Sequence, residues 1–330
     1  MSKYIAGIVF AYALFSLYRI ISTFAPDFSV FYDGARGLLA HQNIYTLPMY
    51  TGLGYPPFTL LPFIPFTLLP YPLAQGIWVS LSFLLFLLCI FLSLPKPTIH
   101  SFCIVFIFAF LAFPTKFTLG MGQVNFAALA LLLLALRFQS GILLGLLFLI
   151  KPHFLLLLPL FGLRYIAQAM VTLSIGVLLT GLDLYGYYFH NVVPQLLVFT
   201  GRGIYYNQGL GAFLSRLLPN TLAGELTMWG SLLIIVSSLW FIWYKKLSFE
   251  KSVLFIIPVF LLVEPLSWQH HYVFLLPVFI WLAFHTKKYL LLFFSYLLVA
   301  INIPHAPALF LSHVFFGNVL VLSLLYHEMA

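Results

Sequence analysis

Long uninterrupted apolar runs restrict this chain more than any other feature of its sequence. The run 73–94, for example, contains no charged side chain, and similar runs recur as far as the C-terminus. Only 7% of the 330 residues are charged, whereas 63% are hydrophobic. A soluble globule draws on about a quarter charged residues to cover its surface, so a water-soluble enzyme is excluded. Continuous runs also differ from the apolar–polar alternation of a transmembrane barrel, and they predict an all-α bundle instead.

The length of the chain sets the expected number of spans. A spanning helix takes roughly 20 residues, so there is room for about ten to twelve spans. Residues 4–22 are expected to form a retained first span. The segment Tyr55–Pro72 contains several prolines and is expected to be bent or re-entrant. The segment 140–163 is expected to break at Lys151-Pro152-His153. No linker or low-complexity tract divides the chain, which predicts a single integral-membrane domain over residues 1–330.

The placement of basic residues predicts the orientation in the membrane. With the N-terminus inside, the unusual polar clusters fall on the outer side, together with the two long connections 23–54 and 184–225. These connections are expected to contain juxtamembrane helices. The protein is therefore expected in the plasma membrane with its active site facing outward, toward the periplasm. The basic residues form no stripe of the kind that binds nucleic acid. Those expected on the cytoplasmic side are Lys3, Lys96, Arg137, Arg164, Lys245, Lys246, Lys251, Lys287 and Lys288.

Two polar clusters are candidates for chemistry. Asp27 directly follows the first apolar run, where it could face a cavity at membrane depth; alternatively it caps the helical run Val30–Ala40. The second cluster extends from Glu264 to His271. Adjacent histidines on a helix point about 100° apart and rarely share a metal ion, so no metal site is expected. Anchoring of Trp268 and the two histidines at the membrane interface is the alternative role of this cluster.

Further polar residues at the ends of the apolar runs could bind a lipid-linked phosphate. Separated cations and amides near the membrane boundary suit such a group. Singly, each could instead be a helix cap or a side chain that extends to the interface. The residues expected to bind the donor phosphate or the substrate are Tyr55, Lys116, Gln123, Asn125, Lys151, Arg202, Asn207, Gln208, Arg216 and Trp268.

Five blocks of the sequence, in order, resemble glycosyltransferase family 87. The first is Asp27-Phe-x-x-Phe-Tyr-x-Gly-Ala-x-x-Leu-Leu-x-His-Gln-x-Ile-Tyr45, followed by Tyr55-Pro-Pro57 with Pro65 and Pro70. The later blocks are Gly122-Gln-Val-Asn125, the run from Gly141 that ends in Ile-Lys-Pro152, Asn207-Gln208 with Arg216, and Ser267-Trp-x-His-His271. The similarity therefore covers most of the chain.

The resemblance implies a polytopic enzyme of the GT-C type. Such an enzyme transfers a sugar, with inversion, from a polyprenyl-phosphate donor to an acceptor hydroxyl outside the cytoplasm. It implies that Asp27 is the general base and that His270 or His271 is the functional histidine. The family includes mannosyltransferases and arabinofuranosyltransferases, so a hexose, most often mannose, is expected and a pentose is the alternative. Gly209 and Glu264 depart from the family pattern, which leaves the lipid or glycan acceptor open.

The residue inventory agrees with this chemistry. A phosphate leaving group departs without protonation, so one general base suffices where a glycosidase needs two carboxyl groups. No cofactor is expected beyond the donor substrate, and the expected partners are the donor, the acceptor and membrane lipids. A transporter or flippase of polyprenyl-linked lipids is the rival hypothesis. It would predict inverted repeats and polar residues near the middle of the spans.

Overall fold

The computed structural model describes residues 3–197 and 203–330, and the regular secondary structure of these residues is helical. The predicted all-α class is confirmed. The α-helices are α1 (Lys3–Ile21), α2 (Pro26–Leu39), α3 (Tyr71–Ser93), α4 (Ile99–Leu111), α5 (Phe113–Met121), α6 (Asn125–Phe138), α7 (Gly141–Ile150), α8 (Leu163–Thr180), α9 (Leu182–Tyr187), α10 (Val193–Leu197), α11 (Leu210–Leu217), α12 (Asn220–Tyr244), α13 (Phe249–Val263), α14 (Leu276–His285), α15 (Tyr289–Ala300), α16 (Ala308–Leu311) and α17 (His313–Met329). The 3-10 helices are η1 (Ile44–Thr46), η2 (Pro57–Leu68), η3 (Pro152–Leu160) and η6 (Gln269–Leu275), and η4 (Tyr188–Val192) is a π-helix.

Fewer helices are long enough to span a membrane than the expected ten to twelve. Among the described residues, α3, α8 and α12 meet the requirements of length and apolar composition. The count rises to five if two bent pairs each form one span: α1 with α2, bent by 48°, and α4 with α5, bent by 69°. Other apolar helices, such as α6, α7 and α15, are shorter.

Prolines explain much of this shortening, because a proline lacks the amide hydrogen that an α-helix needs and collides with the preceding turn. Pro62 and Pro65 lie inside η2, which is a 3-10 helix as a result. The segment predicted to be bent or re-entrant is thus a 3-10 helix from Pro57 to Leu68, and its bent or re-entrant course stays a prediction. The break predicted at Lys151-Pro152 is confirmed, since α7 ends at Ile150 and η3 begins at Pro152.

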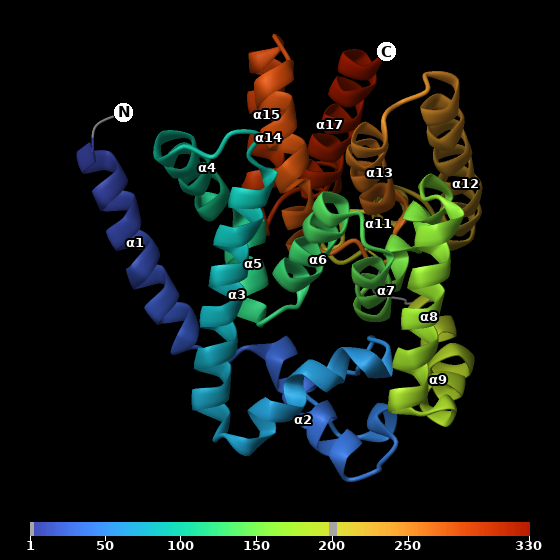
Figure 1. Ribbon diagram of the computed structural model, residues 1–330. Helices are drawn as coiled ribbons and strands as arrows, with labels where there is room; N and C mark the ends of the chain where they lie inside the picture. The colour runs from blue at the N-terminus through green and yellow to red at the C-terminus, as the bar shows by residue number, and fades with distance from the viewer. Residues whose placement is uncertain (1–2, 198–202) are drawn as a thin grey trace.

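The helices form a bundle whose two ends differ (Figure 1). Both chain termini lie at one end, whereas α2 and η2 lie at the other. Two turns rich in lysine lie at the end with the termini: Lys245 Nζ donates to the carbonyl of Ala330 at 2.6 Å, and Thr286 Oγ1 donates to Glu328 at 2.7 Å. The clustering of basic residues at one end agrees with the expected orientation, and the side of the membrane that each end faces stays a prediction.

The turn between α5 and α6 packs directly against the start of α2. Gly122, at this turn, has a φ of 69°, and an added Cβ would lie 2.6 Å from the Cβ of Phe28. Both the left-handed conformation and the close approach therefore require glycine. Trp78 Nε1 donates to the Gly122 carbonyl at 2.8 Å and holds the turn in place. This packing brings Gln123 next to Asp27, although 96 residues separate them.

Candidate active site

A chain of hydrogen bonds begins at Asp27 and crosses the elements that meet at the α5–α6 turn. Asp27 Oδ2 accepts a hydrogen bond from Gln123 Nε2. Gln123 Oε1 accepts from the Tyr55 hydroxyl at 2.7 Å, and that hydroxyl in turn accepts from Lys151 Nζ at 3.3 Å. The Lys151 ammonium also lies 5.0 Å from the centre of the Tyr55 ring, within cation–π range. A carboxylate and an ammonium are thus joined through two neutral side chains.

The same chain continues beyond Lys151 to a second carboxylate. His271 Nε2 lies 3.1 Å from Lys151 Nζ, and His271 Nδ1 lies 3.0 Å from Glu264 Oε2. The other carboxylate oxygen, Oε1, lies 3.1 Å from His153 Nδ1. An ammonium can only donate, so His271 Nε2 must accept and the ring proton is assigned to Nδ1, which donates to Glu264. His271 in this arrangement is neutral.

The electrostatics of these buried groups agree with that assignment. Lys151, His271 and Glu264 lie outside the candidate spans: Lys151 and Glu264 lie in breaks between helices, and His271 lies in η6. Lys151 is only 3% exposed; burial lowers the pKa of its ammonium to about 8, and Glu264 and Asp27 partly oppose this shift. Burial likewise lowers the pKa of His271 to about 4, so its ring is neutral at pH 7. Burial alone would raise the pKa of Glu264, but the neighbouring imidazoles of His153 and His271 hold it well below its usual range.

Prolines place three of the charged groups at the ends or beginnings of helices. Lys151 follows the last residue of α7 and precedes Pro152. Glu264 follows the last residue of α13 and precedes Pro265. A residue before proline is driven out of the α conformation, so both side chains leave their helix there. Asp27 follows a proline in the first turn of α2, where Ala25 is the N-cap. The alternative that Asp27 caps the helix is therefore wrong, because α2 begins at Pro26.

The two neighbouring histidines occupy different positions. His271 belongs to the hydrogen-bonded chain, whereas the Nδ1 of His270 is buried and has no hydrogen-bond partner among the described residues. The backbone carbonyl of His270 accepts from Asn125 Nδ2 and from Thr118 Oγ1, each at 2.9 Å. Asn125 is fully buried. It therefore holds η6 in place through the backbone and is not part of the Asp27 chain.

Another group of the predicted residues joins the segment 203–208 to the start of α17 and to the turn before η6. Arg216 donates to the carbonyls of Gly203, Ile204 and Asn207 and, at 2.8 Å, to Ser312 Oγ. Such a guanidinium has few donors left for a ligand.

Asn207 and Gln208 have similar roles in this segment. Asn207 Nδ2 donates to the Pro265 carbonyl at 2.9 Å, and Gln208 Nε2 donates to the Leu311 carbonyl at 2.7 Å. Trp268, half-buried at the start of η6, pairs through its backbone with Asn207. These contacts place the group beside the site, and its role in substrate binding stays a prediction.

Two further predicted cations do not belong to the hydrogen bonds that begin at Asp27. One lies elsewhere in the fold, and the other is not among the residues that the structure describes. Lys116, on α5, donates to the hydroxyl of Tyr12 on α1 at 3.3 Å. Its ammonium also lies 5.5 Å from the centre of the Tyr12 ring. Arg202 lies outside the described residues. Within residues 3–197 and 203–330, no three His, Cys, Asp or Glu side chains are grouped so as to hold a metal ion.

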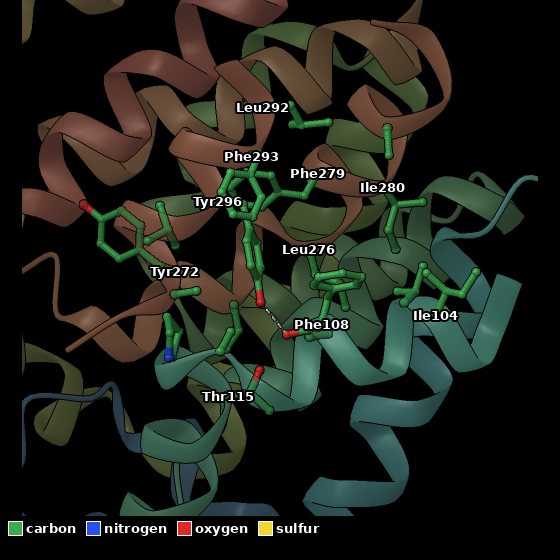
Figure 2. Close-up of a pocket in the computed structure, with 18 of the residues that line it drawn as sticks. Ile104, Phe108, Thr115, Tyr272, Leu276, Phe279, Ile280, Leu292, Phe293 and Tyr296 are labelled. Atoms are coloured by element: carbon green, nitrogen blue, oxygen red, sulfur yellow. Dashed lines mark hydrogen bonds between the residues drawn. The ribbon is translucent and has the colours of Figure 1, made fainter. Parts of the chain in front are cut away.

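An apolar pocket of about 330 Å³ lies beside the site, between α4, α5, α14 and α15 (Figure 2). Tyr272, the residue after His271, lies at one side of it. Tyr296 donates to the Phe108 carbonyl at 2.7 Å inside the pocket (Figure 2). Phe108 and Phe293, each 51% exposed, lie at its rim. The pocket therefore leads from η6 to the apolar outer surface of the bundle.

The sequence considered residue by residue gave no role to two members of this site. Glu264 began the candidate cluster that ends at His271, and His153 belonged to the expected break at Lys151-Pro152, but nothing local showed that the two side chains meet. One signal was present: Glu264, like Lys151, is a charged residue directly before a proline at the end of an apolar helix. That pattern marks a side chain that leaves its helix within the apolar interior.

The comparison with protein families finds a match over more than half of the chain. The model of glycosyltransferase family 87 matches residues 53–265, nearly two thirds of the chain. The matched range includes Tyr55, Gln123, Lys151 and Glu264, whereas Asp27 and His271 lie outside it. No match was found among curated proteins or among solved structures.

Proposed function

Because the chain belongs to glycosyltransferase family 87, we propose that it transfers a hexose, with mannose the expected sugar, from a polyprenyl-phosphate donor to a hydroxyl of a lipid or glycan acceptor. The family and the long apolar helices make it a membrane glycosyltransferase. The donor, the sugar and the roles of individual residues are the proposal. The location of the site at the outer face of the plasma membrane is also part of the proposal. The position of the lysine-rich turns at the other end of the bundle supports this location.

One observation carries the proposal: Asp27 and Lys151 belong to the same hydrogen-bonded unit. The reaction needs a base for the acceptor proton and a positive charge for the leaving phosphate. The hydrogen bonds of the described residues engage only Oδ2 of Asp27, which leaves Oδ1 for an acceptor hydroxyl. Lys151 donates to Tyr55 and His271, and a third ammonium hydrogen stays for a phosphate oxygen.

In the proposed reaction, Asp27 takes the proton of the acceptor hydroxyl while the oxygen of that hydroxyl attacks the anomeric carbon of the sugar. The bond between this carbon and the phosphate oxygen breaks, and its electron pair leaves with the phosphate. Lys151 stabilises the charge that develops on the phosphate, inside a buried site where such an interaction is strong. Attack from the face opposite the phosphate inverts the anomeric centre. No acid is needed for the leaving group.

The transfer itself is tested with membranes that contain the protein. We expect labelled mannose to pass from a synthetic polyprenyl-phosphate mannose to a component of a lipid and glycan extract, with EDTA present because no divalent ion is expected. The product is measured by chromatography of the extract, and membranes without the protein are the control. Transfer from a polyprenyl-phosphate pentose instead would identify the arabinofuranosyl alternative. No transfer from either donor would contradict the proposal and favour the lipid transporter.

We further propose that the pocket of Figure 2 holds part of the polyprenyl tail of the donor, and an Ala283→Trp variant tests this. Ala283 is exposed at the rim of the pocket, so an indole there fills space without disturbing the core. Each CH₂ group that is kept out of an apolar site costs about 0.8 kcal/mol. We expect the KM for a long-chain donor to rise about tenfold, and that for a short-chain donor to change much less. Leu178→Trp, on the exposed face of α8, is the control. If Ala283→Trp changes the KM for the long-chain donor and for the short-chain donor equally, the tail does not lie in this pocket.

A further inference from the structure

Glu264 is a buried carboxylate in a chain of very few charges, and the transfer reaction as proposed does not use it. Its side chain is 9% exposed, and each of its two oxygens lies within 3.1 Å of an imidazole nitrogen. A buried carboxylate is costly unless it is paired and hydrogen-bonded. The contacts of Glu264 meet that condition, and they connect it to the residue that holds Lys151.

We infer that Glu264 is a positioning residue: its carboxylate fixes the ring of His271 so that Nε2 faces Lys151 and holds the ammonium where the donor phosphate is bound. This inference rests on the proposed function. Glu264 would not touch the substrate, and it acts through His271. It therefore adds to the reaction a residue at a position where this chain departs from the family pattern.

The proton assignment explains how the carboxylate would act. Glu264 can only accept, so it selects the form of His271 that carries its proton on Nδ1. That form presents a lone pair on Nε2 to the Lys151 ammonium. Without the carboxylate, the ring could carry its proton on Nε2 instead. Two donors would then face each other across 3.1 Å, and the lysine would have to move away or lose its proton.

A second contact ties Glu264 to the break in the chain from which Lys151 emerges. His153 Nδ1 lies 3.1 Å from Glu264 Oε1, and the His153 ring stacks on Phe260 with centroids 5.4 Å apart. Lys151 and His153 flank Pro152, which ends α7 and begins η3. Glu264 therefore holds one side of the break directly through His153 and the other side through His271.

The charge of Glu264 adds to this geometric effect. The ionisable groups around Lys151 are the phenol of Tyr55, the imidazoles of His270 and His271, and the carboxylates of Asp27 and Glu264. Burial lowers the pKa of Lys151, and only the two carboxylates oppose burial. Removing the negative charge of Glu264 would therefore lower the pKa of Lys151 further, and the ammonium would be lost at a lower pH.

The test compares Glu264→Gln with Glu264→Ala across pH. Glutamine keeps the shape and an acceptor for His271 but removes the charge. At pH 6 we expect the kcat/KM of Glu264→Gln to be near the wild-type value. The fall of kcat/KM at alkaline pH should begin about one pH unit lower than in the wild type, which is the size of the effect of one nearby charge on a pKa. Alanine also removes the acceptor, and we expect its kcat/KM to fall by about 10- to 100-fold at pH 7, the range found for partners that orient a metal-bound histidine. The control is Glu225→Gln, an exposed glutamate on α12.

Binding of polyprenyl phosphate without sugar gives a readout of Lys151 that does not depend on turnover. Binding should weaken at a lower pH in Glu264→Gln than in the wild type. If both variants keep the wild-type pH profiles of transfer and binding and lose only thermal stability, Glu264 is structural and the inference is overturned. The wild type could instead bind polyprenyl phosphate with a pH dependence that changes when Glu264 is replaced, and yet transfer no sugar from any donor. In that case the proposed function fails, but the effect of Glu264 on Lys151 stands.

Discussion

The Asp27→Asn variant is expected to transfer sugar about 10²- to 10⁴-fold more slowly than the wild type, the usual contribution of a positioned general base. Asparagine has the size of aspartate and still offers an oxygen to Gln123 Nε2, so the hydrogen-bonded chain to Tyr55 and Lys151 can form. What disappears is the group that takes the acceptor proton. The loss should therefore fall on kcat, while the KM for the donor changes little.

The matched control for this variant lies on the same helix. Asp33→Asn changes an exposed carboxylate two turns along α2 and is expected to keep wild-type activity. The measurement is initial-rate transfer of labelled sugar by purified protein, with thermal unfolding recorded for each variant. An Asp27→Asn protein that folds and transfers at the wild-type rate would remove Asp27 from the role of base and would leave the proposed reaction without one.

Replacing Lys151 by methionine is expected to lower kcat/KM by about 10²- to 10³-fold, the cost of removing one charge-stabilising donor from a buried site. Methionine has a similar length and fits the space without a positive charge. Removing one partner of a buried ionic network leaves the remaining charges less well compensated, which costs about 3–5 kcal/mol of stability. The thermal stability of this variant should therefore fall, since Tyr55 and His271 also each lose a donor. Transfer is compared at a temperature at which both proteins are folded.

Lys251→Met is the matched control for this prediction. Lys251 lies in the first turn of α13, at the opposite end of that helix from Glu264, and its loss should not affect transfer. Donor binding is measured as the affinity for polyprenyl phosphate, which should fall when the Lys151 ammonium is absent. Unchanged binding and unchanged transfer in Lys151→Met would show that another group meets the phosphate charge. Lys116 and Arg202 would then be the next residues to replace.

Local features of the sequence predicted the parts of the fold that depend on local physics. Continuous apolar runs without charges predicted helices in a membrane, because a spanning backbone must satisfy its own hydrogen bonds. The proline at residue 152 predicted a break, which the structure contains, and the prolines around residue 62 lie in a 3-10 helix where an α-helix could not continue. The span count was less predictable, since an apolar run does not reveal whether it forms one long helix or two short ones.

The site was predictable only in part for a similar reason. Asp27 stood out by its position after the first apolar run, and the polar blocks marked Gln123, Lys151 and His271. Arg216 was expected to bind the donor phosphate or the substrate. Its side chain donates to three carbonyls and a serine hydroxyl, and its role in binding stays a prediction. A sequence lists donors and acceptors but does not say which of them are already paired inside the protein.

By itself, the sequence determined the all-α membrane class, the breaks in the helices and the types of charge available at their ends, because these depend on neighbours a few residues apart. The tertiary structure alone decided which of those charges meet. Gln123 lies 96 residues from Asp27, and His271 lies 120 residues from Lys151. Packing between distant helices sets such contacts, so only the folded chain joins Asp27 to Glu264.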